Sequence, residues 1–291
     1  MAPSDFTSSE LETGKVSLPK LGKMLKVQTE EKTGFLKKIT YVGTPVATIT
    51  LIELLIFGGR LKEASIAYTL LLLSLSYSIT VMKKPEIRKI YQAFLLLAIF
   101  RLVNFSMPIF FEENLYSFIF VYVPMAIPIT LAAAHQKVEY ERKRDTLKRM
   151  WIYLPLSILA GLILGQIEYI LIGAKELISD ISSINLLILI IVMVFIVGLI
   201  EELIFRSILQ TSLEKFLGST WGIFLSSLLF GIMHSTYGTP YEIVYTFFLG
   251  GFLGYLFYRT RSLPLVVMIH GSINVFLFGI IPHTGPIFGL I

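Results

Sequence analysis

The chain has 291 residues, of which 55% are hydrophobic and only 15% are charged, and its formal net charge is +5. So apolar a composition excludes an ordinary soluble domain and predicts an integral membrane protein. The absence of cysteine excludes disulfides, thiolate nucleophiles and cysteine-ligated metal or haem sites. Basic loops account for the positive charge in such a protein, so contact with the lipid bilayer is expected and a nucleic-acid partner is not.

The first segment, Met1–Lys38, mixes Lys and Glu with Ser and Thr and lacks the apolar core of a secretory signal peptide. We predict a polar cytosolic arm over residues 1–38. A single transmembrane domain is expected over residues 39–291.

Nine apolar segments follow the arm, and each is long enough to suggest a membrane-embedded helix. They are Ile39–Gly58, Ala64–Met82, Ile90–Phe111, Tyr116–Ala134, Trp151–Ala174, Ile184–Phe205, Thr220–Ser235, Tyr241–Tyr258 and Pro264–Ile281. None alternates with the period of two that marks a membrane strand. Thr220–Ser235 has only 16 residues, so we expect it to be re-entrant or steeply tilted, or to have other boundaries. The predicted fold is an all-α polytopic bundle of eight or nine membrane-embedded helices.

Basic residues gather in every second connection between these segments. They are Lys83, Lys84, Arg88 and Lys89, then Lys137, Arg142, Lys143, Arg144, Lys148 and Arg149, then Arg206 and Lys215, and finally Arg259 and Arg261. The positive-inside rule places these connections in the cytoplasm. The N-terminus is then inside and the C-terminus outside.

Ionisable side chains within apolar segments are costly, so each needs a partner or a function. Glu53, Arg101 and Glu168 are isolated in their segments. We expect them to pair between helices or to extend toward the membrane interface.

Glu201 and Glu202 are different, because two adjacent carboxylates cannot share one local partner. Glu202 precedes Arg206 by four residues, the favourable order for an ion pair within one helix. Glu201 projects about 100° away around the same helix, so it is free to face a cavity. Glu201 is therefore the predicted catalytic carboxylate, and Glu202 is the predicted partner of Arg206.

Two histidines fall in the apolar segments that follow. His234 lies four residues after Phe230, and His270 lies four residues before Asn274, so each pair shares a helix face. A buried carboxylate together with an imidazole can activate water. A second imidazole with a carboxamide can then stabilise the oxyanion that forms when water attacks a peptide carbonyl. This set of residues predicts peptide hydrolysis.

Three motifs therefore occur in order, each on its own apolar segment: EExxxR from Glu201, FxxxH from Phe230 and HxxxN from His270. In these motifs the sequence resembles the type II CAAX prenyl endopeptidases and the wider CAAX protease and bacteriocin-processing family. The resemblance covers about residues 184–281, the expected catalytic core.

The resemblance implies a glutamate-dependent protease that removes the last three residues after a prenylated cysteine in a CAAX-type protein or peptide. By this resemblance Glu201 is the general base with His234, and His270 with Asn274 stabilises the oxyanion. Glu202, Arg206 and Phe230 match supporting positions. The site is expected to open toward the cytoplasm, in the cell membrane of a prokaryote or the endoplasmic reticulum of a eukaryote. No cofactor or metal is implied.

Two alternatives remain open. A zinc-dependent membrane metallopeptidase could use Glu and His ligands, although the HExxH motif is absent. A non-enzymatic transporter or proton relay also places Glu and His within the membrane.

Two further protease classes fit poorly. Intramembrane aspartyl proteolysis would need membrane-embedded Asp, yet Asp5, Asp145 and Asp180 all fall outside the apolar segments. A serine–histidine dyad of Ser272 with His270 is disfavoured because side chains two residues apart on a helix diverge.

Overall fold

A computed structural model describes residues 18–110, 114–136 and 143–287, and over these residues it is helical with no strand. The prediction of an all-α fold is confirmed. The contacts divide the chain into two compact units, residues 1–43 and 44–291. Of the predicted 1–38 arm, residues 1–17 lie outside the described part, and residues 18–38 belong to helix α2. The connections at 111–113 and 137–142 also lie outside it.

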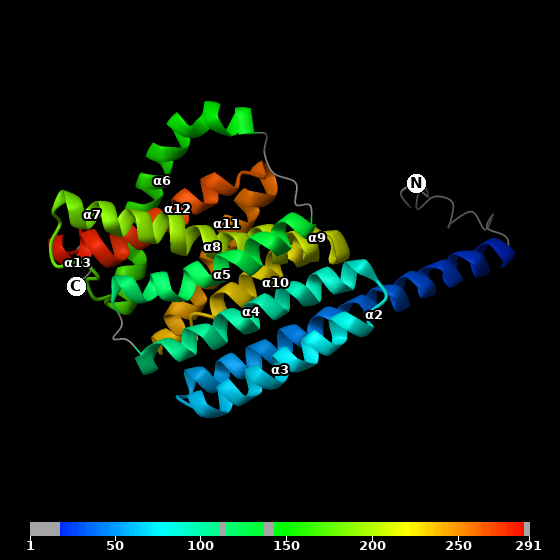
Figure 1. Cartoon of the computed structure of the whole chain (residues 1–291). Coiled ribbons are helices and arrows are strands. Elements are labelled where there is room, and N and C mark those ends of the chain that lie inside the picture. The colour runs from blue at the N-terminus through cyan, green and yellow to red at the C-terminus, as the bar shows by residue number, and fades with distance from the viewer. Residues whose placement is uncertain (1–17, 111–113, 137–142, 288–291) are drawn as a thin grey trace. The chain divides into compact units, whose positions relative to one another are not determined.

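Each predicted apolar segment lies largely in helical structure, although Thr220–Ser235 runs past the end of α10, and the α-helices are labelled in Figure 1. They are α2 (Leu18–Phe57), α3 (Leu61–Val81), α4 (Pro85–Phe110), α5 (Leu115–Gln136), α6 (Lys143–Ile172), α7 (Ser183–Ile190), α8 (Leu199–Glu202), α9 (Thr211–Leu217), α10 (Ser219–Ile232), α11 (Pro240–Thr260), α12 (Leu263–Val275) and α13 (Ile281–Thr284).

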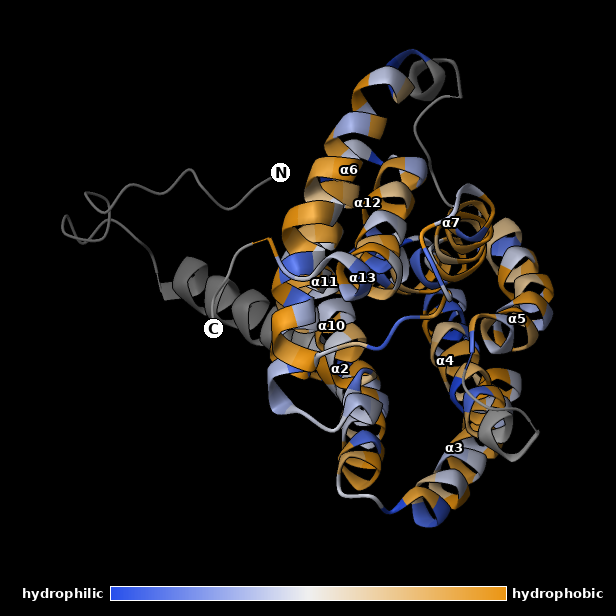
Figure 2. Ribbon diagram, turned by 90° about the vertical axis from the view of Figure 1, so that its left-hand side faces the viewer, coloured by the Kyte–Doolittle hydropathy of each residue, from blue (hydrophilic) through white to orange (hydrophobic). Residues whose placement is uncertain are grey.

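Six helical stretches among the described residues are long and apolar enough to cross a membrane. They are Leu36–Phe57, Leu61–Val81, Leu115–Gln136, Lys148–Ile172, Ser183–Leu217 and Leu263–Thr284. The predicted count of eight or nine is therefore not confirmed, because α4, α10 and α11 are helical without meeting these requirements. Large apolar side chains are exposed on α3, α5 and α6, and Figure 2 colours much of these helices as hydrophobic. Such surfaces suit contact with lipid.

The helix expected to end at Phe205 continues to Leu217. Residues Ser183–Leu217 form one helical stretch of 35 residues. Two π-helical segments, Ile191–Gly198 and Leu203–Gln210, flank the short helix α8 that carries both glutamates. Every residue of Leu203–Gln210 is buried. Arg206 is thus a fully buried helix residue and not, as the charge pattern suggested, part of a cytoplasmic connection. Its positive charge must therefore be paired with an acidic side chain inside the protein.

Helix α12 packs against both α6 and the first π-helical segment. Small residues permit this close approach: a Cβ atom at Gly271 would lie 2.5 Å from Val194 Cα, and one at Gly161 would lie 2.6 Å from Ser272 Cβ. Glycine contacts of this kind let membrane helices pack backbone to backbone. They fix the depth and rotation of the helix that carries His270.

Helix α10 is too short to cross a bilayer. Its 14 residues rise about 21 Å, against a hydrocarbon core of roughly 30 Å. A turn follows α10, and α11 packs along α10 so closely that a Cβ atom at Gly231 would lie 2.8 Å from the Ile243 carbonyl oxygen. This short helix ends just before His234 and so delivers that side chain to the interior.

Candidate active site

A cavity of about 50 Å³ lies among the helices, with room for a few water molecules. The predicted site residues Glu201, His234, His270 and Asn274 all line it, together with Phe230. They come from α8, α10 with its following turn, and α12. The structure therefore brings together the residues of the three motifs, including His234.

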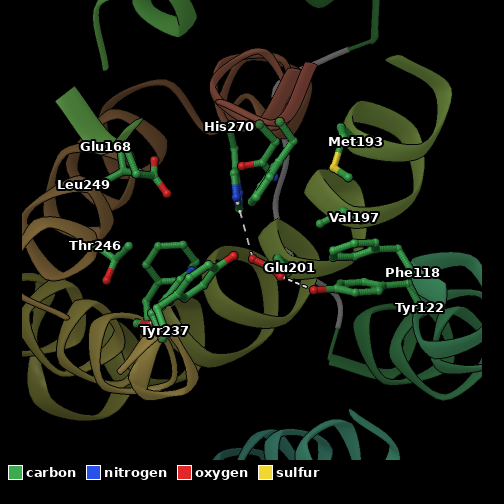
Figure 3. Close-up of a pocket in the computed structure, with 14 residues that line it drawn as sticks. Phe118, Tyr122, Glu168, Met193, Val197, Glu201, Tyr237, Thr246, Leu249 and His270 are labelled. Atoms are coloured by element: carbon green, nitrogen blue, oxygen red, sulfur yellow. Dashed lines mark hydrogen bonds and ion pairs between the residues drawn. The ribbon is translucent and has the colours of Figure 1, made fainter. Parts of the chain in front are cut away.

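Glu201 occupies the centre of this site, as Figure 3 shows. Its Oε1 accepts a hydrogen bond from the Tyr122 hydroxyl of α5, and its Oε2 lies 3.7 Å from His270 Nε2. Only about a tenth of the Glu201 side chain is exposed. One carboxylate oxygen is thus held by a phenol, while the other faces the cavity beside an imidazole.

Glu202 turns away from the cavity, as its helical position predicts. Its Oε2 lies 3.0 Å from Arg206 Nε, so the predicted ion pair is present and both side chains are fully buried. The contact lacks hydrogen-bond geometry and is held by charge. The Arg206 guanidinium also lies 4.8 Å from the centre of the Phe230 ring, within cation–π range.

Glu202 also contacts His270, which the sequence did not indicate. The distance between Glu202 Oε1 and His270 Nδ1 is 2.9 Å. An ionised carboxylate only accepts, so Nδ1 is the donor and carries a proton. Nε2 is left to face Glu201 and the cavity. One Glu202 oxygen therefore pairs with Arg206, and the other fixes the orientation of the His270 ring.

His234 is oriented by its own helix. Its Nδ1 lies 2.8 Å from the Phe230 carbonyl oxygen, which can only accept. Nδ1 is then the donor, and the unprotonated Nε2 can accept a hydrogen bond in the cavity. The Phe230 ring lies 4.8 Å from the His234 ring and 5.7 Å from the His270 ring, so it spaces the two imidazoles.

Several residues of the cavity were missed from the sequence. They include Phe118, Tyr122, Tyr237 and Thr246. Neutral side chains on distant segments carry no charge pattern that would single them out. Tyr122 is the most important of them, because it binds Glu201 directly.

The three isolated ionisable residues have two different outcomes. Glu53 and Arg101 form a buried interhelical ion pair at 2.5 Å, as expected. Glu168 instead lines the cavity and faces the carboxyl group of Glu242 on α11, which is an acid and not a basic partner. Glu168 therefore interacts with a residue of another helix, as expected, but that residue is a second acid, and the packing of α6 also places Glu168 at the cavity.

The described residues contain no group of three His, Cys, Asp or Glu side chains arranged to hold a metal ion. The carboxylate, imidazole and carboxamide groups beside the cavity are of the kinds that can act as acids, bases and hydrogen-bond donors toward water.

Fold and site together define a multi-pass membrane protein with a buried glutamate–histidine–asparagine site between its apolar helices. Residues 183–276 match the family model described as "Type II CAAX prenyl endopeptidase Rce1-like". The resemblance expected from the three motifs is confirmed over this part of the chain, which contains all seven motif residues. No curated protein and no solved structure matches the chain. The family so described is one of endopeptidases, and this part of the chain is similar to it.

Proposed function

We propose that the protein is an intramembrane endopeptidase that cleaves a prenylated CAAX-type substrate after its modified cysteine and releases the C-terminal tripeptide. The observation that carries this proposal is the convergence of Glu201, His234, His270 and Asn274 on one buried, water-sized cavity within a segment that matches this family. We further propose that the cavity opens toward the cytoplasm, where the basic connections are predicted to lie.

In the proposed reaction Glu201 removes a proton from water. Tyr122 holds Glu201 Oε1, so Oε2 is the oxygen available to the water. His234 Nε2 accepts the second water hydrogen and fixes the direction of attack. The carbonyl carbon then becomes tetrahedral and its oxygen becomes an oxyanion.

The other side of the cavity stabilises that oxyanion. His270, held at Nδ1 by Glu202, donates from Nε2 when the ring carries both protons. Asn274 lies one turn further along the same helix face and donates from its amide. The proton taken by Glu201 passes to the departing amine as the C–N bond breaks. Each donor is built into a packed helix before the substrate arrives, which is the arrangement that electrostatic catalysis requires.

The prenyl group is expected to raise the efficiency of cleavage. Transfer of an alkyl chain into the bilayer contributes about 0.8 kcal/mol per methylene, so a prenylated peptide concentrates where this site lies. A farnesylated peptide ending in a CAAX sequence should have a kcat/KM at least about 100-fold above that of the same peptide without the farnesyl group. Mass spectrometry of both reactions with the purified protein measures this ratio. Equal values would show that the substrate is an unmodified peptide.

Metal removal separates this mechanism from that of a zinc peptidase. Cleavage should persist at full rate after treatment with a strong chelator, because the water is activated by Glu201 and His234. Elemental analysis of the purified protein should find far less than one zinc per chain. One zinc per chain, with activity lost on its removal and restored on its return, would instead identify a metallopeptidase.

A further inference from the structure

The turn that carries His234 is held by side chains from helices in the N-terminal half of the chain. Irregular backbone among apolar membrane helices is stable only when protein groups satisfy its hydrogen bonds. His234 follows α10, whose last carbonyls need partners beyond the helix end. The N–H groups of Met233 and His234 satisfy two of them, those of Leu229 and Gly231. The ring of His234 donates to the Phe230 carbonyl, and Arg101 of α4 donates to the Met233 carbonyl. The backbone immediately before His234 is therefore bound by a residue from the N-terminal half.

The residue immediately after His234 is bound as well. The Ser235 hydroxyl donates to Glu53 Oε2 at 2.6 Å, and Glu53 comes from α2. The same carboxylate accepts two hydrogen bonds from Arg101, at 2.7 Å from Nε and 2.5 Å from Nη2. Tyr68 of α3 donates to Glu53 Oε1. These side chains are buried, with exposed fractions of 0% for Glu53, 2% for Arg101 and 1% for Ser235.

We propose that Glu53 and Arg101 are positioning residues for His234. Together they hold residues 233 and 235, the two neighbours of His234, and so fix the backbone from which the imidazole enters the cavity. This inference rests on the proposed function, in which His234 orients the attacking water. It also gives the N-terminal helices, which lie outside the matched residues 183–276, a role in the reaction.

The geometry requires an arginine at position 101. Its planar guanidinium binds both Glu53 oxygens through two parallel hydrogen bonds and still reaches the Met233 carbonyl. A lysine is a single point charge and cannot make these three contacts together. The reaction is sensitive to such placement, since a shift of about 1 Å in a reacting group can lower a rate on the order of 100-fold.

Ser235→Ala tests the proposal with the smallest change, because it removes one hydrogen bond and leaves the ion pair. We expect kcat for the farnesylated peptide to fall about tenfold while KM changes less than twofold. The matched control is Ser227→Ala, a buried serine of α10 whose hydroxyl donates within its own helix, to the Ile223 carbonyl at 2.6 Å. Equal kcat values for the two variants would overturn the proposal.

A double variant tests whether the effect passes through His234. In a His234→Ala background, Ser235→Ala should change kcat less than twofold, because no imidazole remains to be positioned. A general loss of structure would lower the rate tenfold in both backgrounds, and that result would also overturn the proposal. Arg101→Lys should behave as Ser235→Ala does, with the charge on Glu53 still neutralised.

A third measurement needs no activity, so it separates this inference from the proposed function. The chain has four histidines, so histidine-labelled protein gives a short set of ring signals in NMR. Ser235→Ala should shift or broaden the His234 signal, assigned with His234→Ala, and Ser227→Ala should not. If the wild type cleaves no prenylated peptide, the proposed function fails. The spectrum still decides whether Glu53 and Arg101 hold His234 in place. An unchanged His234 signal in Ser235→Ala would overturn the positioning role of Glu53 and Arg101 and leave the proposed function untouched.

Discussion

Glu201→Gln is expected to lower the rate of peptide cleavage by at least about 1000-fold, because a carboxamide cannot take a proton from water. The amide has nearly the same shape, and its oxygen can still accept the hydrogen bond from Tyr122. The variant should therefore fold as the wild type does. Initial rates on the farnesylated peptide, measured with the detergent-purified protein, give the size of the effect.

The matched control for this change is Glu176→Gln. Glu176 is an exposed acid in the connection between α6 and α7, and it does not line the cavity. Its replacement should leave the rate unaltered. If Glu201→Gln cleaved the peptide as fast as Glu176→Gln, the carboxylate would not be the base.

Arg206→Met is expected to destabilise the protein by about 3–5 kcal/mol. The substitution keeps the volume of the side chain but leaves the Glu202 carboxylate buried without its cation. The double variant with Glu202→Gln should recover most of this loss, since the buried charge is then gone. Unfolding in detergent, followed by circular dichroism, measures both changes. Equal stability of Arg206→Met and the wild type would show that Glu202 does not need the guanidinium.

The exposed pair of Arg60 and Glu63 provides the comparison for Arg206. Its ion pair has a similar length, 2.8 Å, but the two side chains are 61% and 49% exposed. Water solvates both groups there, so Arg60→Met should leave the unfolding transition almost unchanged. The contrast separates the effect of burial from the effect of losing an arginine.

The site was predictable to the extent that its residues are close together along a helix. The spacing of Glu202 and Arg206 predicts their ion pair, and the rotation of one residue directs Glu201 elsewhere, into the cavity. Helix periodicity also places His270 on a definite face of α12, whereas His234 lies in the turn after α10. Spacing says nothing about contacts between helices, so the Glu202–His270 bond and the Tyr122–Glu201 bond were not expected.

The all-helical fold followed from apolar runs, whereas the number of crossings did not. Composition cannot tell an apolar helix that spans the membrane from one that ends inside it. Helix α10 illustrates this limit, because it has 14 residues and ends before His234, whereas the apolar run continues to Ser235. Arg206 shows the same limit, since a basic residue near the end of an apolar run resembles a loop charge until its buried partner is known.

The most direct test of the central claim is the mass of the products that the purified protein releases from a farnesylated CAAX peptide. The proposed mechanism predicts one cut, directly after the modified cysteine, with an intact tripeptide released by the wild type and none by Glu201→Gln. A cut at another bond, or the same products from Glu201→Gln, would contradict it.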